Sequence, residues 1–116
     1  MAYETEFLIS LLLTLAIEIP VAVLAVKYVF KAEATGVTKI IFAGFIASFS
    51  TLPYLWFVLP ALITERTMFY IVGEASVILA EAIIYRQLLN LKTHRALTIS
   101  FFANLASFLA GFLFIY

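Results

Sequence analysis

The chain of 116 residues contains no cysteine and no aspartate, and only one histidine and three prolines. Without cysteine it has neither a disulfide framework nor thiolate metal or redox chemistry. Charged residues make up 12% of the chain, and seven Lys and Arg balance seven Glu. A soluble domain carries about 25% charged residues, and a nucleic-acid-binding domain carries a basic excess. The composition therefore excludes a soluble globular domain and gives no basis for a nucleic-acid partner.

What the chain has in abundance is hydrophobic residues, at 66% of the total. A helix that crosses a lipid bilayer needs roughly 20 mostly apolar residues. Four stretches reach this length, at residues 7–30, 39–63, 69–89 and 97–116. The short connections at 31–38, 64–68 and 90–96 make successive helices antiparallel neighbours. We therefore predict an all-α integral membrane protein whose residues 1–116 form one four-helix domain in up-down-up-down order.

The first apolar stretch also has to be compared with a secretory signal peptide. Ala32-Glu33-Ala34 has the small-x-small form of a cleavage site, but Glu4 and Glu6 stand where a signal peptide carries positive charge. The apolar run is also longer than the hydrophobic region of a signal peptide. We expect this stretch to be a retained transmembrane helix.

The basic residues predict the orientation of the chain. Six lie on the side of the first and third loops: Lys27, Lys31, Lys39, Arg86, Lys92 and Arg95. The opposite side has Arg66 as its one basic residue, together with Glu4, Glu6 and Glu65. Cytoplasmic loops carry an excess of Lys and Arg. We therefore expect a multi-pass protein of the cell membrane, with loops 31–38 and 90–96 in the cytoplasm and both termini outside.

Polar residues inside the four stretches recur at one depth. With a rise of about 1.5 Å per residue, Glu18 lies about 16 Å from the outer end of its helix. Thr51, Glu81 and Asn104 each lie about 18 Å from the outer ends of theirs. The hydrocarbon core is about 30 Å thick, so each helix contributes one polar group near its middle. Ionisable groups at this depth indicate a functional site by default.

Spacing along the third stretch extends this layer. Glu74 and Glu81 are seven residues apart on one helical face, and Tyr85 continues the face four residues later. Glu74 lies about 7 Å from the outer edge, where Arg66 or bulk water is its expected partner. The candidate ligand- or ion-binding residues are Glu18, Thr51, Glu74, Glu81, Tyr85 and Asn104. Glu18 and Glu81 are the candidates for any metal ligation.

The fourth stretch carries a seam of small and polar residues, and Trp56 stands near the outer end of the second. The seam consists of Ser100, Asn104, Ser107 and Gly111, spaced 4-3-4. Such spacing favours close helix packing with hydrogen bonds across the interface. We interpret Trp56 as a membrane anchor or a packing residue.

Soluble-enzyme motifs are missing from the chain. It has no HExxH, GxSxG, P-loop or dinucleotide-binding fingerprint. Its serines have no histidine or lysine at their own depth to activate them. We expect no cofactor, and an intramembrane enzyme that uses the two carboxyls on a lipid-like substrate is the least favoured function.

The layout resembles that of the small multidrug-resistance transporters, which have about this length, four helices and a membrane-embedded glutamate, here Glu18. Their aromatic and glycine motifs in the later helices are not matched, and Glu81 is foreign to them. The chain is more similar to a group of uncharacterised four-span prokaryotic proteins. The residues that carry this similarity over most of the chain are Glu18-x-Pro20, Thr51-x-Pro53-x-x-Trp56, Tyr85-Arg86 and Asn104-x-x-Ser107-Phe108-x-x-Gly111. The resemblance implies the four-span fold and a prokaryotic source, and it implies no activity.

Two functions remain open. In the first, the protein is a transporter that binds a cation, a proton or a small solute between Glu18 and Glu81. Two close carboxyls do not both ionise in an apolar site, so one stays protonated until a cation arrives. The apolar inner segments at 21–26 and 40–47 then predict a blind pocket that opens outward. In the second, the protein is a non-transporting accessory or scaffold subunit in a homo-oligomer or a larger membrane complex. Its carboxyls would then be neutral and would only hydrogen-bond neighbouring helices.

Overall fold

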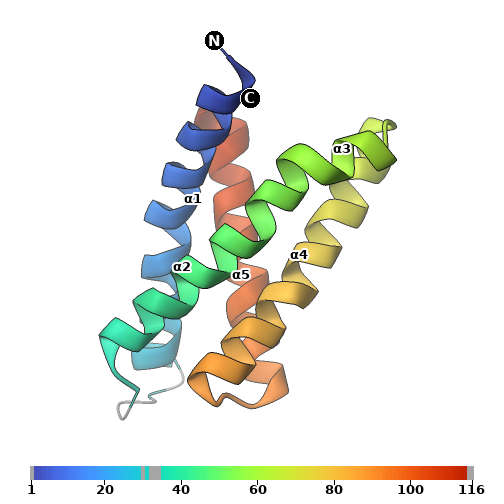
Figure 1. The fold of residues 1–116 in the computed structure, drawn as a ribbon. Coiled ribbons are helices and arrows are strands. Elements are labelled where there is room, and N and C mark those ends of the chain that lie inside the picture. Colours follow the sequence, from blue (N-terminus) through green and yellow to red (C-terminus); the bar gives the residue numbers. More distant parts are fainter. Residues whose placement is uncertain (1, 30, 32–34, 115–116) are drawn as a thin grey trace.

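The computed structural model of the chain describes residues 2–29, 31 and 35–114. All regular structure in these residues is helical (Figure 1). The elements are α1 (Tyr3–Leu24) with the π-helix η1 (Ala25–Val29), α2 (Val37–Pro53) with the π-helix η2 (Tyr54–Val58) and α3 (Leu59–Leu62), α4 (Arg66–Leu89), and α5 (Thr93–Phe114). They form four helical spans of 27, 26, 24 and 21 residues, each long and apolar enough to cross a membrane. The predicted all-α chain with four candidate spans is thus confirmed.

The four spans form a bundle in which each runs opposite to the next along the chain (Figure 1). α1 packs against α2 and α5, and α4 packs against the same two helices. The order around the bundle is therefore α1, α2, α4, α5, and α1 faces α4 across the interior. α1 begins and α5 ends at the same end of the bundle (Figure 1).

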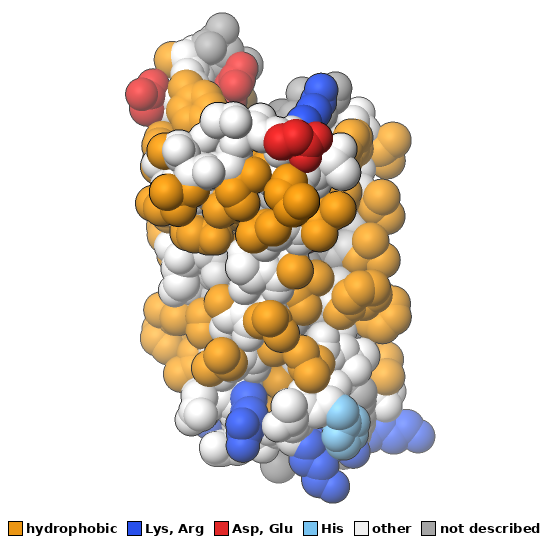
Figure 2. Space-filling model, turned by 90° about the vertical axis from the view of Figure 1, so that its right-hand side faces the viewer, with side chains coloured by type: hydrophobic (Ala, Val, Ile, Leu, Met, Phe, Trp, Pro, Cys, Tyr) orange, Lys and Arg blue, Asp and Glu red, His pale blue; other side chains and the backbone are white. Residues whose placement is uncertain are grey.

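Charged side chains gather at the two ends of the molecule (Figure 2). On the face shown, acidic side chains occupy the end where α1 begins, together with one basic group, and the other end carries basic side chains and the histidine. A mostly hydrophobic surface lies between them, as on a helix bundle that contacts lipid. We refer below to the acidic end and the basic end of the bundle.

The helices extend beyond the apolar stretches that predicted them. α1 begins at Tyr3 instead of residue 7, since negative charge such as that of Glu4 is favourable in the first turn of a helix. α4 begins at Arg66 instead of residue 69, because the Glu65 carboxylate caps it and accepts the N–H groups of Thr67 at 3.2 Å and Met68 at 2.6 Å. α5 begins at Thr93 instead of residue 97. Residues 30 and 116, where two predicted spans end, and residues 32–34 lie outside the described part of the chain.

Prolines shape the second span near the acidic end. Proline has no N–H to donate to the residue four positions earlier. Pro53 is the last residue of α2, and Pro60 lies just beyond the π-helix η2. Between the two prolines η2 forms one wide helical turn, in which the Leu59 N–H bonds to the carbonyl of Tyr54, five residues back. This wide turn positions Leu55 and Trp56 on the wall of an internal pocket.

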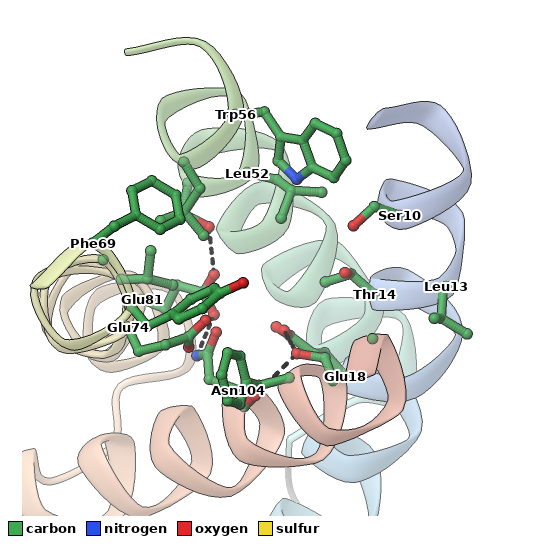
Figure 3. Close-up of a pocket in the computed structure, with 18 of the residues that line it drawn as sticks. Ser10, Leu13, Thr14, Glu18, Leu52, Trp56, Phe69, Glu74, Glu81 and Asn104 are labelled. Atoms are coloured by element: carbon green, nitrogen blue, oxygen red, sulfur yellow. Dashed lines mark hydrogen bonds between the residues drawn. The ribbon is translucent and has the colours of Figure 1, made fainter. Parts of the chain in front are cut away.

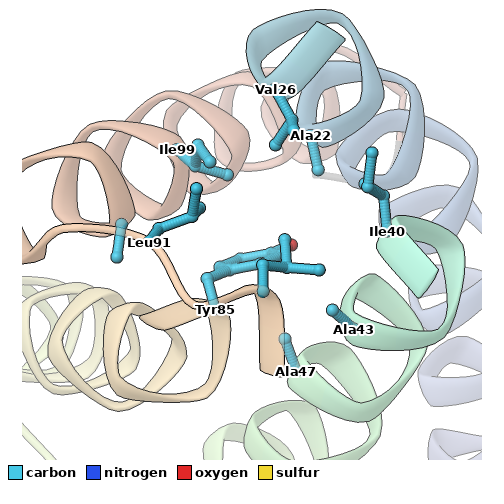
Figure 4. Packing of buried hydrophobic residues seen from close by; sticks show 10 residues of the cluster. Ala22, Val26, Ile40, Ala43, Ala47, Tyr85, Leu91 and Ile99 are labelled. Atoms are coloured by element: carbon cyan, nitrogen blue, oxygen red, sulfur yellow. The ribbon is translucent and has the colours of Figure 1, made fainter. Parts of the chain in front are cut away.

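The interior is filled at the basic end. The cluster of buried hydrophobic residues there consists of Ala22, Val26, Ile40, Ala43, Ala47, Tyr85, Leu89, Leu91, Ala96 and Ile99, with the Tyr85 ring at its centre (Figure 4). Small residues let the helices approach closely, and a Cβ added at Gly44 would lie 2.9 Å from Cγ1 of Ile19. We call this set the inner plug. The acidic half has a smaller cluster, Leu11, Leu15 and Leu52, and it encloses space between the helices.

Candidate functional site

A pocket of about 260 Å³ lies between the four spans in the acidic half of the bundle (Figure 3). Its lining residues come from α1, from α2 and η2, from α4 and from α5. They run from Tyr3 and Glu6, in the first turns of α1, down to Glu18 and Glu81. Below the two glutamates the inner plug fills the bundle, so the pocket is blind and its mouth faces the acidic end.

The floor of the pocket is a pair of buried carboxyl groups on opposite helices. Glu18 of α1 and Glu81 of α4 are each only 1% exposed. Both line the pocket, from opposite sides of the interior (Figure 3). An ionised carboxyl has no hydrogen to donate, so two facing carboxyls bond each other only when one of them carries a proton. The two residues that we predicted at one depth therefore line one pocket.

Glu81 is held by the two other members of the predicted polar layer. Asn104 donates its side-chain amide to Oε1 of Glu81 at 2.9 Å and to the carbonyl of Ser100 at 2.8 Å. Oγ1 of Thr51 lies 2.5 Å from Oε2 of Glu81 and 2.9 Å from the carbonyl of Ala47. A threonine hydroxyl has one hydrogen, so Thr51 shares it between these two acceptors unless Glu81 carries a proton and donates it to Thr51.

Glu18 is held from α5 by Ser107, which donates its hydroxyl to Oε2 at 2.6 Å. The sequence predicts Ser107 only as part of a packing seam and not as a candidate site residue. Its spacing of three residues from Asn104 puts both on one face of α5, which was the available signal. The seam thus does more than pack, because Ser107 and Asn104 each bond one of the two carboxyls.

A polar stripe on α1 leads from the mouth to the floor. Glu6, Ser10, Thr14 and Glu18 follow one another at intervals of four residues, and all four line the pocket. Ser10 and Thr14 are buried although α1 is otherwise strongly apolar. On this face we predicted only Glu18 as a site residue, yet the four-residue interval is the helical repeat that reveals the others.

Glu74 lies on the wall of the pocket, two turns above Glu81 on α4. It is half-buried, and among the described residues its carboxyl has no hydrogen-bond or ion-pair partner. Arg66, the partner expected from the sequence, lies instead over the ring of Tyr70, with its guanidinium carbon 5.9 Å from the ring centre. Glu74 is therefore free to face the pocket.

Tyr85 is the one predicted site residue that does not line the pocket. Its side chain is fully buried in the inner plug, one turn below Glu81. Its hydroxyl has no hydrogen-bond partner among the described residues. Trp56, which we interpreted as an anchor, does line the pocket near its mouth.

Acidic side chains line the pocket and basic ones do not. Four are glutamates, namely Glu6, Glu18, Glu74 and Glu81, and no Lys, Arg or His is among the described residues that line it. The described part of the chain has no cluster of three or more His, Cys, Asp or Glu arranged for a metal ion. Carboxyls without a basic neighbour in a site of low dielectric attract positive charge.

Comparisons with models of known protein families, with curated proteins and with solved structures found no match to the chain. The resemblance to prokaryotic four-span proteins therefore remains a prediction. Four apolar helices in a chain of this length fit a small polytopic membrane protein, and its buried polar groups converge on Glu18 and Glu81.

Proposed function

We propose that the protein is a membrane transporter that binds a cation or a small cationic solute at Glu18 and Glu81, in competition with a proton. The observation that carries the proposal is the position of these two facing carboxyls at the floor of a pocket with no basic side chain on its described lining. Ionisable residues inside membrane spans are costly, and they commonly mark the paths of ions and protons.

The chemistry of the pair follows from mutual repulsion. Two adjacent carboxylates in a low-dielectric site do not both remain ionised, so an empty site retains a proton. A cation that enters the pocket neutralises the pair and displaces this proton. A proton on Glu81 also lets Thr51 bond both Glu81 and the carbonyl of Ala47 with one hydrogen each, which supports the protonated, cation-free state of this exchange.

The proposed orientation has the pocket mouth outside the cell and loops 31–38 and 90–96 in the cytoplasm, as a multi-pass protein of the cell membrane. Six basic residues near the basic end and one near the acidic end support this orientation. In this proposed orientation the described conformation is open to the outside, since the inner plug closes the bundle below Glu18 and Glu81. Delivery to the cytoplasm then requires α1 or α2 to move relative to α4 and α5.

One observation favours a second function, a scaffold subunit that transports nothing. Both carboxyls already bond to a neighbouring helix, Glu81 through Thr51 and Asn104 and Glu18 through Ser107. Interhelical bonds of this kind contribute about 0.6–2 kcal/mol each to helix association in membranes. A neutral pair that serves only this purpose would bind no cation.

The experiment that separates the two functions is thermal melting of the detergent-purified protein between pH 5 and pH 9. Sodium, potassium, magnesium and tetramethylammonium chlorides are the probes. Wild type is compared with the Glu18→Gln, Glu81→Gln double variant and with Glu4→Gln, which changes an exposed glutamate in the same way. A transporter site predicts stabilisation by one of these cations that only the double variant loses. Superimposable curves for all three proteins at every salt and pH refute cation binding and support the scaffold.

A further inference from the structure

Three buried polar atoms in the described chain have no hydrogen-bond partner: Oε1 of Glu18, Oγ of Ser48 and the hydroxyl oxygen of Tyr85. Ser48 and Tyr85 are completely buried, and Glu18 is 1% exposed. Buried polar groups in proteins are almost always satisfied, by the protein or by an ordered water. No bulk water is present in the membrane core to satisfy them.

The packing brings these three atoms to the same level of the bundle. Ser48 lies one turn from Gly44, where an added Cβ would meet Ile19 of α1, and one turn from Thr51, which bonds Glu81 of α4. Ser48 is therefore on the part of α2 that passes between α1 and α4.

Tyr85 reaches the same place from α4. It follows Glu81 by one turn, and its ring lies in the same buried cluster as Ala22, one turn below Glu18, and Ala47, next to Ser48 in the chain (Figure 4). Its hydroxyl is within electrostatic range of both carboxyls. The three residues with unpartnered atoms thus lie on neighbouring turns of α1, α2 and α4, between the pocket floor and the inner plug.

The chemistry of the three atoms identifies the ligand. Glu18 Oε1 offers an acceptor, whereas the hydroxyls of Ser48 and Tyr85 each also have a hydrogen that needs an acceptor. A metal cation would satisfy oxygen lone pairs but would accept neither hydrogen. A water molecule accepts both hydroxyl hydrogens and donates to Glu18 Oε1, and buried waters typically make about three such bonds.

We propose that one structural water is bound below the pocket floor by Glu18, Ser48 and Tyr85. This water fixes the carboxyl of Glu18 in its orientation toward Glu81. It also extends the hydrogen-bonded chain one helical turn beyond the floor, along a path open to a proton and closed to any solute. The water site itself stands on the unpartnered atoms alone, and only its role in proton movement rests on the proposed function.

Whether the melting temperature falls or rises when one of the hydroxyls is removed tests this water site. Tyr85→Phe and Ser48→Ala each remove one hydroxyl and keep the packing nearly unchanged, and melting is measured without added cations. If the water is bound, each variant melts lower than wild type by about 4 °C or more, because a hydrogen bond is lost. An unchanged or higher melting temperature overturns the site, since removal of a truly unpartnered hydroxyl relieves a desolvation cost. Tyr28→Phe, on a side chain that is 71% exposed, is the matched control.

Two further measurements keep the outcome decisive if one variant folds poorly. The Tyr85→Phe, Ser48→Ala double variant should melt higher than the sum of the two single effects predicts, because both act through one water. An experimental density map that resolves waters should show a peak bonded to all three atoms. Hydroxyls that bond each other directly with no peak between them refute the site. Neither result depends on whether a cation binds at Glu18 and Glu81. The cation-dependent melting experiment therefore tests the proposed function separately from the water site.

Discussion

Tyr3 donates its hydroxyl to the main-chain carbonyl of Trp56 over 2.5 Å, which ties the first turn of α1 to the wide turn η2. In a regular helix that carbonyl would accept the N–H of residue 60, but residue 60 is proline and has none. The two rings also contact, with centroids 5.0 Å apart. The carbonyl that Pro60 leaves free thus holds one side of the pocket mouth together, and both Tyr3 and Trp56 line the pocket.

Replacement of the Tyr3 hydroxyl should weaken this connection and leave the ring contact. We expect Tyr3→Phe to lower the free energy of unfolding by about 1 kcal/mol, because the Trp56 carbonyl loses its partner. Denaturant titration of the protein in detergent micelles measures the change. The exposed Tyr28→Phe is the control, and equal stability of both variants would show that the bond contributes nothing.

Glutamine at position 81 should preserve the fold and remove the function. Its amide resembles a protonated carboxyl, since it donates to Thr51 and accepts from Asn104 with the same shape. We therefore expect Glu81→Gln to unfold within about 1 kcal/mol of wild type, whereas Glu81→Leu loses about 1–3 kcal/mol by leaving Thr51 and Asn104 unpaired. In reconstituted vesicles, Glu81→Gln should abolish cation-driven proton flux. A variant that transports at the wild-type rate would remove Glu81 from the mechanism.

Cation binding should depend on pH with a definite sign. A cation binds the pair after a proton has left, so a rise in pH favours the cation and a fall in pH opposes it. Below the titration of the pair, the apparent Kd should increase about tenfold for each unit by which the pH falls, if one proton is exchanged. Calorimetric titration at several pH values measures the slope. A Kd that stays constant from pH 5 to pH 9 contradicts the exchange of a proton at Glu18 and Glu81.

Three glycines should respond to alanine in a definite order. A Cβ at Gly44 would lie 2.9 Å from Cγ1 of Ile19, whereas at Gly73 the nearest atoms are flexible ends of Leu55 and Leu59 at 3.0 and 3.2 Å. At Gly36 no atom lies within 4 Å. We expect Gly44→Ala to destabilise most, by about 1–3 kcal/mol from overpacking, Gly73→Ala less, and Gly36→Ala not at all. Melting temperatures in another order would contradict the close approach of α1 and α2.

The absence of cysteine makes the proposed orientation directly testable. Single cysteines at Glu4 and Lys92, both exposed and near opposite ends of the bundle, provide the reporters. In intact cells, a membrane-impermeant maleimide should label Glu4→Cys and leave Lys92→Cys unlabelled until the membrane is permeabilised. Labelling of Lys92→Cys alone in intact cells would reverse the orientation.

The amino-acid sequence by itself determined the number and the approximate position of the spans. A bilayer requires about 20 apolar residues in a helix, and this requirement is local, so it can be read from the chain. The depth of Glu18, Thr51, Glu81 and Asn104 followed in the same way, because the rise of a helix is constant. Helix ends were less predictable, since caps such as Glu65 extend a helix into polar residues.

Only the tertiary structure decided which side chains meet. Depth along a helix says nothing about rotation around its axis, and the pairings of Glu18 with Ser107 and of Glu81 with Thr51 and Asn104 depend on that rotation. The pocket, the position of Tyr85 below its floor and the contact of Tyr3 with Trp56 likewise join residues far apart in the chain. Such contacts arise when four helices pack together at once, so no local property of one helix determines them.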